Sequence, residues 1–180
     1  ESLPYSQRAS LSDATQDTLN PDGTTQRLVN DKVGYIRNSV KATVDAYDGS
    51  VDLYEFDKND PVLKAWEGVF PDVVKPEAEI SDELRQHFRY PEDMFKVQRD
   101  LLARYHVDDP NVFFNNDAFW SVPNDPTAEE SRQLNQPPYY VMAADPETGK
   151  PTFQLTTSYR GLNREFLSAH MAVSSDPETY

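Results

Sequence analysis

The clearest pattern of hydrophobic and polar positions lies between residues 35 and 56, where apolar and polar side chains alternate on both sides of Asp48-Gly49. Alternation with a period of two is typical of a β-strand that buries one face. Asp-Gly is a favoured loop for a two-residue type I′ turn. We therefore predict a β-hairpin with Asp48 and Gly49 as its loop. One apolar face is expected to pack on the core: Val40, Ala42, Val44, Ala46, Val51 and Leu53.

The register of this predicted hairpin places Asp45 directly opposite Asp52 on its other face. Directly opposed Cβ atoms lie about 5 Å apart, so the two carboxylates repel each other unless their charge is compensated. Solvation of both groups is the favoured explanation, followed by an Arg or Lys from elsewhere in the chain and then by a bound cation or shared proton. The candidate binding residues are therefore Asp45 and Asp52, with Tyr47 and Tyr54 beside them.

The segments that follow the hairpin carry helix signals. Asp60-Pro61 predicts the N-cap and first position of a helix that ends at Pro71, in which Trp66 and Phe70 are interpreted as core residues. A second short helix is expected after Ser81. The longest predicted helix starts at Pro91, ends near His106 and carries an apolar stripe, and Asp109-Pro110 predicts a further helical turn. The stripe comprises Met94, Val97, Leu101, Leu102 and Tyr105.

Strand patterns return in the last third of the chain. Residues 139–144 and 152–157 predict a second hairpin, and residues 166–173 favour a strand. They follow a polar, Pro-rich linker over residues 121–138, in which residues 127–130 match a capping box that indicates a short helix to Leu134. The predicted fold class is α+β: an antiparallel sheet built from two hairpins with short helices packed mainly on one face.

Domain organisation follows from composition along the chain. Residues 1–34 are rich in polar side chains without periodicity and predict a flexible or loop-like arm. Residues 35–180 are expected to form a single α+β domain, truncated at its C-terminal end, because residues 174–177 resemble a turn into a further strand. The chain begins at Glu1 rather than Met, which is expected of an excised or processed piece.

Charge and composition exclude several function classes. The net charge of −14 disfavours a nucleic-acid surface, because binding phosphates needs clustered Lys and Arg. The chain has no Cys, which removes disulfides, thiolate nucleophiles and Cys-ligated zinc. No apolar run in these 180 residues approaches the roughly 18 that cross a bilayer.

The candidate chemistry is weak. His87, His106 and His170 have no metal-ligand spacing, and no GxSxG motif supports a Ser-His-Asp triad. Carboxylate pairs for glycoside cleavage and a calcium site at residues 57–60 are alternatives with little support. We predict no catalytic residue, no metal and no cofactor.

Several motifs resemble those of an uncharacterised family of bacterial, largely actinobacterial, integral membrane proteins. The most specific is YIRNSVKATVDAYDG at residues 35–49, and RYPEDMF at residues 89–95 and PYY at residues 138–140 follow in the same order. The resemblance implies several membrane spans near the N-terminus of the whole protein, followed by a large region outside the cytoplasm. It carries over no catalytic or binding residue.

The resemblance leads to a functional expectation at the extracytoplasmic side of the cell membrane. The chain would be an interaction or scaffolding module whose partners are the membrane spans of its own full-length chain and envelope proteins or glycans. The alternative is an envelope glycan-, lipid- or peptide-binding or hydrolysing domain that uses acidic and aromatic residues. The oligomeric state is left open, since an open strand edge can pair with a second copy of a fragment.

Overall fold

The computed structural model of the chain describes residues 35–128, 134–146 and 148–176 and, before them, four two-residue strands. Strand β1 (Ala9–Ser10) pairs with β4 (Lys32–Val33), and β2 (Thr18–Leu19) pairs with β3 (Thr25–Gln26). The rest of the predicted arm over residues 1–34 lies outside the described residues.

The chain divides into two compact units. Unit 1 comprises Glu1–Ser2 and Tyr35–Phe88, and unit 2 comprises Leu3–Gly34 and Arg89–Tyr180. The single domain expected over residues 35–180 stays a prediction.

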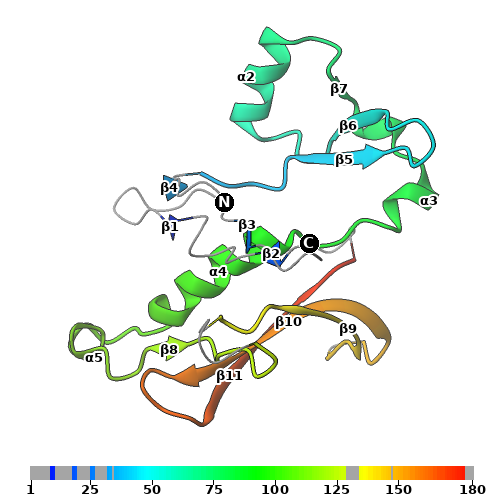
Figure 1. Cartoon of the computed structure of the whole chain (residues 1–180). Helices are drawn as coiled ribbons and strands as arrows, with labels where there is room; N and C mark the ends of the chain where they lie inside the picture. The colour runs from blue at the N-terminus through cyan, green and yellow to red at the C-terminus, as the bar shows by residue number, and fades with distance from the viewer. Residues whose placement is uncertain are drawn as a thin grey trace. The chain divides into compact units, whose positions relative to one another are not determined.

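Unit 1 is built around a three-stranded sheet in the order β5-β6-β7. Strands β5 (Val40–Val44) and β6 (Val51–Glu55) are antiparallel, and β7 (Val74–Lys75) is parallel to β6. The parallel pair requires a crossover, which helix α2 (Pro61–Val69) supplies on one side of the hairpin (Figure 1). The short 3-10 helix η1 (Glu77–Glu79) and helix α3 (Asp82–Arg85) follow.

The first hairpin forms, but its predicted register is wrong. Val44 pairs with Val51 and Thr43 with Asp52, so the loop comprises the four residues 46–49 instead of two. The backbone N–H of Asp45 donates to the Ser50 carbonyl at 2.9 Å, and that of Gly49 donates to the Asp45 carbonyl at 3.0 Å. Gly49 adopts a φ of +76°, which suits glycine. Asp45 therefore does not face Asp52.

The burial of the two hairpin faces is also the reverse of the prediction. On the apolar face, Val44 is 65% exposed and Val51 is 57% exposed. The opposite face carries Tyr54, which packs in a buried cluster with Ile80 and Phe88. The large aromatic ring of Tyr54 finds apolar partners in the segment after β7, whereas helix α2 leaves the apolar face partly open.

Lysine 41 lies on the buried face of the hairpin. Its ammonium group sits over the ring of Phe56, 4.8 Å from the centroid, and over that of Phe88 at 5.6 Å. Burial lowers the pKa of Lys41 to about 8. Aromatic faces thus solvate this cation in part.

The predicted helix starts are confirmed. Asp60, Ser81 and Asp109 are the N-caps of α2, α3 and α5 (Pro110–Asn115), and the side chain of each accepts a backbone N–H. Helix α4 (Glu92–Tyr105) follows Pro91 as expected. The interpretation of Trp66 and Phe70 as core residues is wrong, since they are 59% and 50% exposed.

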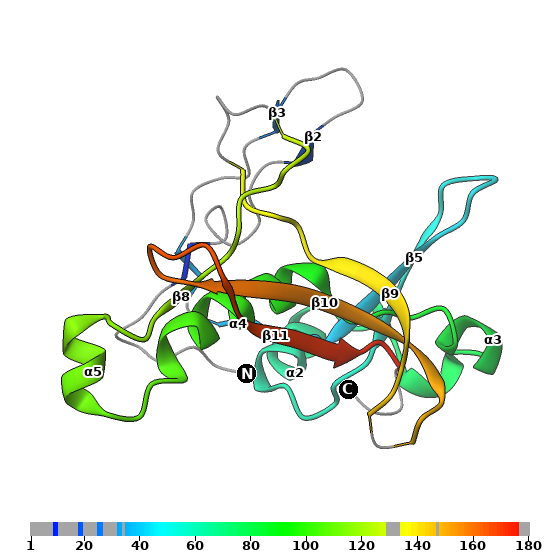
Figure 2. The same ribbon diagram turned by 90° about the horizontal axis from the view of Figure 1, so that it is seen from below.

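Unit 2 contains an antiparallel sheet around the long strand β10 (Pro151–Gly161). Strands β9 (Tyr139–Ala144) and β11 (Leu167–Ser174) flank β10, and β8 (Trp120–Ser121) pairs with its last residues (Figure 2). These pairings confirm the second hairpin and the last predicted strand. The α+β class with antiparallel sheets is confirmed, although the two hairpins belong to separate sheets.

Helix α4 packs against this sheet with a different face from the predicted stripe. Its buried residues are Phe95, Val97, Arg99 and Ala103, so Val97 is the stripe position that is fully buried. Phe95 forms a core cluster with Leu155 and Tyr90. The Tyr159 hydroxyl donates to the Arg99 carbonyl at 3.0 Å. The face of α4 that is buried is therefore the one that contacts Leu155 and Tyr159 of β10.

The segment interpreted as a linker has structure of its own and a hydrogen bond to α4. Asn124 and Asn135 form an antiparallel bridge within the segment, and the Arg99 guanidinium of α4 donates to the Gln136 carbonyl at 3.2 Å. The capping-box helix expected over residues 127–134 falls mostly on residues 129–133, which lie outside the described residues.

Candidate functional site

The four residues predicted to bind a ligand do not form one site. The Asp45 carboxylate accepts the Tyr47 backbone N–H at 2.7 Å and thereby shapes the hairpin loop. The Asp52 carboxylate pairs with the Lys75 ammonium at 2.8 Å, so a Lys from β7 compensates its charge. Tyr54 lies in the core, and Tyr47 is fully exposed at the loop. A binding role for these residues stays a prediction, without the like-charge pair that motivated it.

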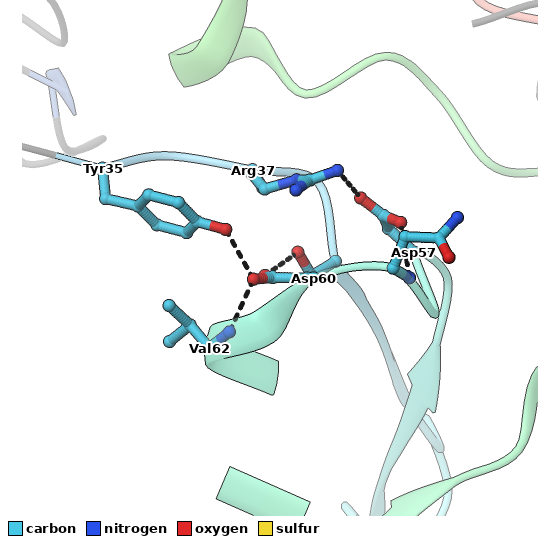
Figure 3. A network of polar contacts seen from close by, with 7 residues as sticks. Tyr35, Arg37, Asp57, Asp60 and Val62 are labelled. Carbon is cyan, nitrogen blue, oxygen red and sulfur yellow. Dashed lines mark hydrogen bonds and ion pairs between the residues drawn. The ribbon is translucent and has the colours of Figure 1, made fainter. Parts of the chain in front are cut away.

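A buried polar network forms instead around Asp60, at the start of helix α2 (Figure 3). Asp60 is only 4% exposed. Its carboxylate accepts hydrogen bonds from the Tyr35 hydroxyl at 2.5 Å, from the Val62 backbone N–H at 2.9 Å and from the Ser39 hydroxyl. The network joins the segment before β5 to the N-terminus of α2.

The hydrogen bonds decide the charge state of Asp60. Burial raises the pKa of this carboxyl, but hydrogen bonds from Ser39, Tyr35 and the backbone N–H groups of Val62 and Leu63 outweigh burial and lower the pKa to about 2. Beside it, Arg37 pairs with Asp57 at 2.5 Å. Asp60 is therefore an anion with its lone pairs occupied, which suits a structural role better than proton transfer.

Sequence reasoning found Asp60 as an N-cap but missed two of its partners. Tyr35 and Ser39 lie 25 and 21 residues before Asp60 in the chain. A helix N-cap is recognisable from its immediate neighbours, whereas a side chain that far away is brought in by the path of the hairpin. No local pattern marks Tyr35 or Ser39.

An apolar hollow of about 610 Å³ lies beside the network, between α2 and the sheet of unit 1. We call it the α2 hollow. Its sheet wall includes Val40, Leu53 and Val74, and its helix wall includes Leu63, Trp66 and Phe70. The rings of Trp66 and Phe70 stack with centroids 5.3 Å apart and planes inclined by 19°. A concave apolar surface of this size is typical of a site that receives an apolar group.

Titratable side chains elsewhere in the described residues offer no alternative centre. In the described residues, no group of three His, Asp or Glu side chains is placed to hold a metal ion. The His106 ring stacks on Trp120 with centroids 3.4 Å apart, and its nitrogens contact the carbonyls of Leu102 and Ala118. His170 lies 3.4 Å from the Ser158 hydroxyl on a neighbouring strand. The His106 contacts are those of a packed structural histidine, whereas His170 is exposed on its strand.

Among the described helices, none is both long enough and apolar enough to cross a bilayer. The fold and the hollow define an α+β protein segment with an exposed apolar surface and a satisfied polar network beside it. The chain belongs to the uncharacterised protein family UPF0182, which it matches over residues 1–180. This membership confirms the resemblance to an uncharacterised actinobacterial family.

The relatives are proteins of actinobacteria. The chain is 74% identical over 181 residues to a UPF0182 protein of Corynebacterium glutamicum strain R, 69% identical to one of Corynebacterium diphtheriae and 63% identical to one of Rhodococcus jostii. Each alignment covers 99–100% of this chain and 18% of the relative. The chain therefore spans about a fifth of the length of these relatives. No solved structure matches it.

Proposed function

We propose that this chain is an interaction or scaffolding module on the extracytoplasmic side of a multi-pass bacterial membrane protein, and that the α2 hollow is its contact surface. The observation that carries the proposal is the exposure of two stacked aromatic rings, Trp66 and Phe70, in a concave apolar surface. Exposed apolar surface of this kind marks a place where another molecule or segment binds.

The polar groups around the hollow favour binding over catalysis. Asp60 is held as an anion by several donors, and Arg37 is engaged by Asp57. A general acid or base needs a pKa near the working pH and access to its substrate, and Asp60 has neither. The network therefore acts as a fixed support for the wall of the hollow.

The proposed location rests on the motifs at residues 35–49, 89–95 and 138–140, which resemble those of membrane proteins with a large region outside the cytoplasm. The length of the relatives leaves ample chain for membrane spans and further domains. A net charge of −14 suits a hydrated surface away from anionic headgroups.

The second candidate function is an envelope ligand-binding domain. The volume of the hollow suits a small ligand, and its aliphatic and aromatic lining favours a lipid or an apolar peptide over a glycan. Glycans require a larger number of convergent hydrogen-bonding groups than this lining supplies.

Cysteine labelling of the full-length protein tests the proposal, because these 180 residues contain no Cys. Tyr47→Cys places a thiol on the exposed hairpin loop. We expect a membrane-impermeant maleimide to label this variant in intact cells as well as in permeabilised cells. The unmodified full-length protein is the control for other thiols. Labelling after permeabilisation alone would overturn the extracytoplasmic location.

The same chemistry tests the contact surface. Phe70→Cys places a thiol in the α2 hollow. We expect it to react readily in the 180-residue chain but slowly in the full-length protein, while Tyr47→Cys reacts at a similar rate in both. Equal reactivity of Phe70→Cys in the two contexts would show that the hollow is uncovered and would overturn its role as a contact surface.

A further inference from the structure

We infer that the α2 hollow is occupied by an apolar segment of the same polypeptide, from outside these 180 residues, that carries a Lys or Arg next to its apolar side chains. This inference rests on the proposed function, since it assigns an occupant to the surface proposed there. Three observations lead to it: the apolar lining, the acidic rim and the share of the whole protein that lies outside the chain.

The lining of the hollow requires an apolar occupant. Trp66 and Phe70 on the helix wall and Val40 on the sheet wall all remain exposed. The polar atoms beside them are engaged with each other through Asp60 and through the Arg37–Asp57 pair. A polar ligand would find few open hydrogen-bonding groups, whereas apolar side chains would remove the exposed rings from water.

The rim of the hollow supplies negative charge. Glu67 lines the hollow from α2, and the anionic carboxylate of Asp60 also belongs to the lining. In the described part of the chain, Glu67 takes part in no salt bridge. Arg37, the basic residue of the lining, is already paired with Asp57. A Lys or Arg on the occupant would complement this rim.

The same charges disfavour two other occupants. A second copy of the chain would bring two acidic rims together, and each chain carries a net charge of −14. An anionic phospholipid would bring its headgroup towards Glu67 and would be repelled in the same way. A polypeptide with a basic residue meets neither obstacle.

The size of the whole protein favours a segment of the same polypeptide over a separate protein. The chain spans 18% of its relatives, so about four-fifths of their length lies outside it. A segment tethered through a short flexible linker reaches an effective concentration on the order of millimolar, so that a modest apolar contact is then enough to keep the hollow filled.

Photo-cross-linking in the full-length protein, in its own membranes, identifies the occupant. Phe70 is replaced by p-benzoylphenylalanine, and Trp66 carries the same probe in a second variant, so that a folding defect at one position does not decide the result. Phe114, an exposed aromatic residue of α5 in unit 2, carries the probe as the matched control. Two differently tagged copies are expressed together, and the cross-linked peptides are identified by mass spectrometry.

We expect the probes at Phe70 and Trp66 to join a peptide of the same copy, outside the 180 residues, with a Lys or Arg beside the joined side chain. The Phe114 probe should give a different product or none. Glu67→Lys should lower the yield of the hollow cross-link, and Glu67→Gln should lower it less. Equal cross-link yields in the parent and in both Glu67 variants would overturn the inference that the occupant carries a Lys or Arg beside its apolar side chains.

The remaining outcomes separate the inference from the proposed function. A cross-link to another protein, or between the two tagged copies, would overturn the intramolecular occupant but leave an interaction module. A cross-link to lipid would overturn the inference and favour the ligand-binding alternative. The absence of any cross-link, together with full reactivity of Phe70→Cys in the full-length protein, would overturn both the inferred occupant and the proposed contact surface.

Discussion

At the scale of single residues, Asp60 shows how one side chain serves two structural tasks. Its carboxylate caps α2 through the Val62 N–H and also binds the hydroxyl groups of Tyr35 and Ser39. Its pKa of about 2 lies below the ordinary value of 3.8. A lowered pKa means that the anion stabilises the fold above pH 3.8, and that this contribution is lost as the pH falls through about 2.

Asp60→Asn should therefore lower the free energy of unfolding at pH 7 by about 2 kcal/mol, because Asn still caps a helix but lacks the charge that the network binds. The deficit should shrink as the pH falls from 4 towards 2. Asp109→Asn is the matched control, since Asp109 caps α5 through the N–H groups of Asn111 and Val112. Urea unfolding across this pH range is the measurement. Equal losses in the two variants would contradict the role of Tyr35 and Ser39.

Lys41 is the second residue whose charge depends on its surroundings. Its pKa of about 8 is below the ordinary value of 10.5, because burial disfavours the ammonium form. Between these pH values the unfolded chain binds more protons than the folded chain, so stability rises with pH in this window. Below pH 8 the full cost of burying the cation is present, offset in part by the rings of Phe56 and Phe88.

Lys41→Met should raise the free energy of unfolding at pH 7 by about 1 kcal/mol, a value reduced for partial solvent exposure and for the lost ring contacts. It should also abolish the gain in stability between pH 8 and 10.5. Lys64→Met, on the exposed side of α2, should change neither quantity. A variant less stable than the parent would mean that the ring contacts outweigh the cost of burial. Thermal or urea unfolding at several pH values measures both effects.

At the scale of elements, the loops of the two hairpins share the same pattern of hydrogen bonds, although the hairpins belong to different sheets. Asp45 N–H donates to Ser50, and Asp145 N–H donates to the Lys150 carbonyl at 2.8 Å. In both loops the glycine N–H returns to the carbonyl of the leading Asp, and the φ angles are +76° at Gly49 and +68° at Gly149. The leading Asp also accepts backbone N–H groups of its own loop. The prediction of a two-residue turn at Asp48-Gly49 was wrong because it did not include the hydrogen bonds that Asp45 makes across a four-residue loop.

Gly49→Ala and Gly149→Ala should each lower the free energy of unfolding by about 1–2 kcal/mol, because a Cβ disfavours a positive φ. Neither added methyl group meets an atom within 4 Å, so backbone strain is the whole effect. Gly68→Ala is the matched control in helix α2, where the Cβ also meets nothing, and it should raise stability by about 0.5–1 kcal/mol. A loss of stability at all three positions would contradict the argument.

At the scale of the whole molecule, the chain spans 18% of the length of its relatives, and its unit 1 exposes apolar side chains at α2 and on the apolar hairpin face. Trp66, Phe70, Val44 and Val51 all remain at least half exposed. Helix α2 buries Leu63 but leaves the larger side chain of Trp66 exposed to solvent, so the helix covers its sheet only in part. The proposal that another segment of the polypeptide completes this cover follows from that incompleteness.

The features of this protein that could be predicted from its sequence are those set by neighbouring residues: the helix starts and the strands of the two hairpins. Asp60-Pro61, Ser81 and Asp109-Pro110 mark helix starts because an N-cap acts on backbone groups two or three residues away. The strands of both hairpins were found for the same reason, since alternation and turn residues lie next to each other in the chain. The motif at residues 35–49 led to the expectation of an uncharacterised actinobacterial family, and the chain belongs to the uncharacterised family UPF0182.

Tertiary structure alone decided which surfaces meet. The alternation in the first hairpin separates two faces, but the burial of either face depends on whether Ile80 and Phe88 or helix α2 covers it. The Asp60 network joins residues up to 25 positions apart, and the α2 hollow exists because one crossover helix fails to close over a sheet. Local patterns record short-range hydrogen bonding and periodicity, whereas the burial of a face is a property of contacts between distant segments.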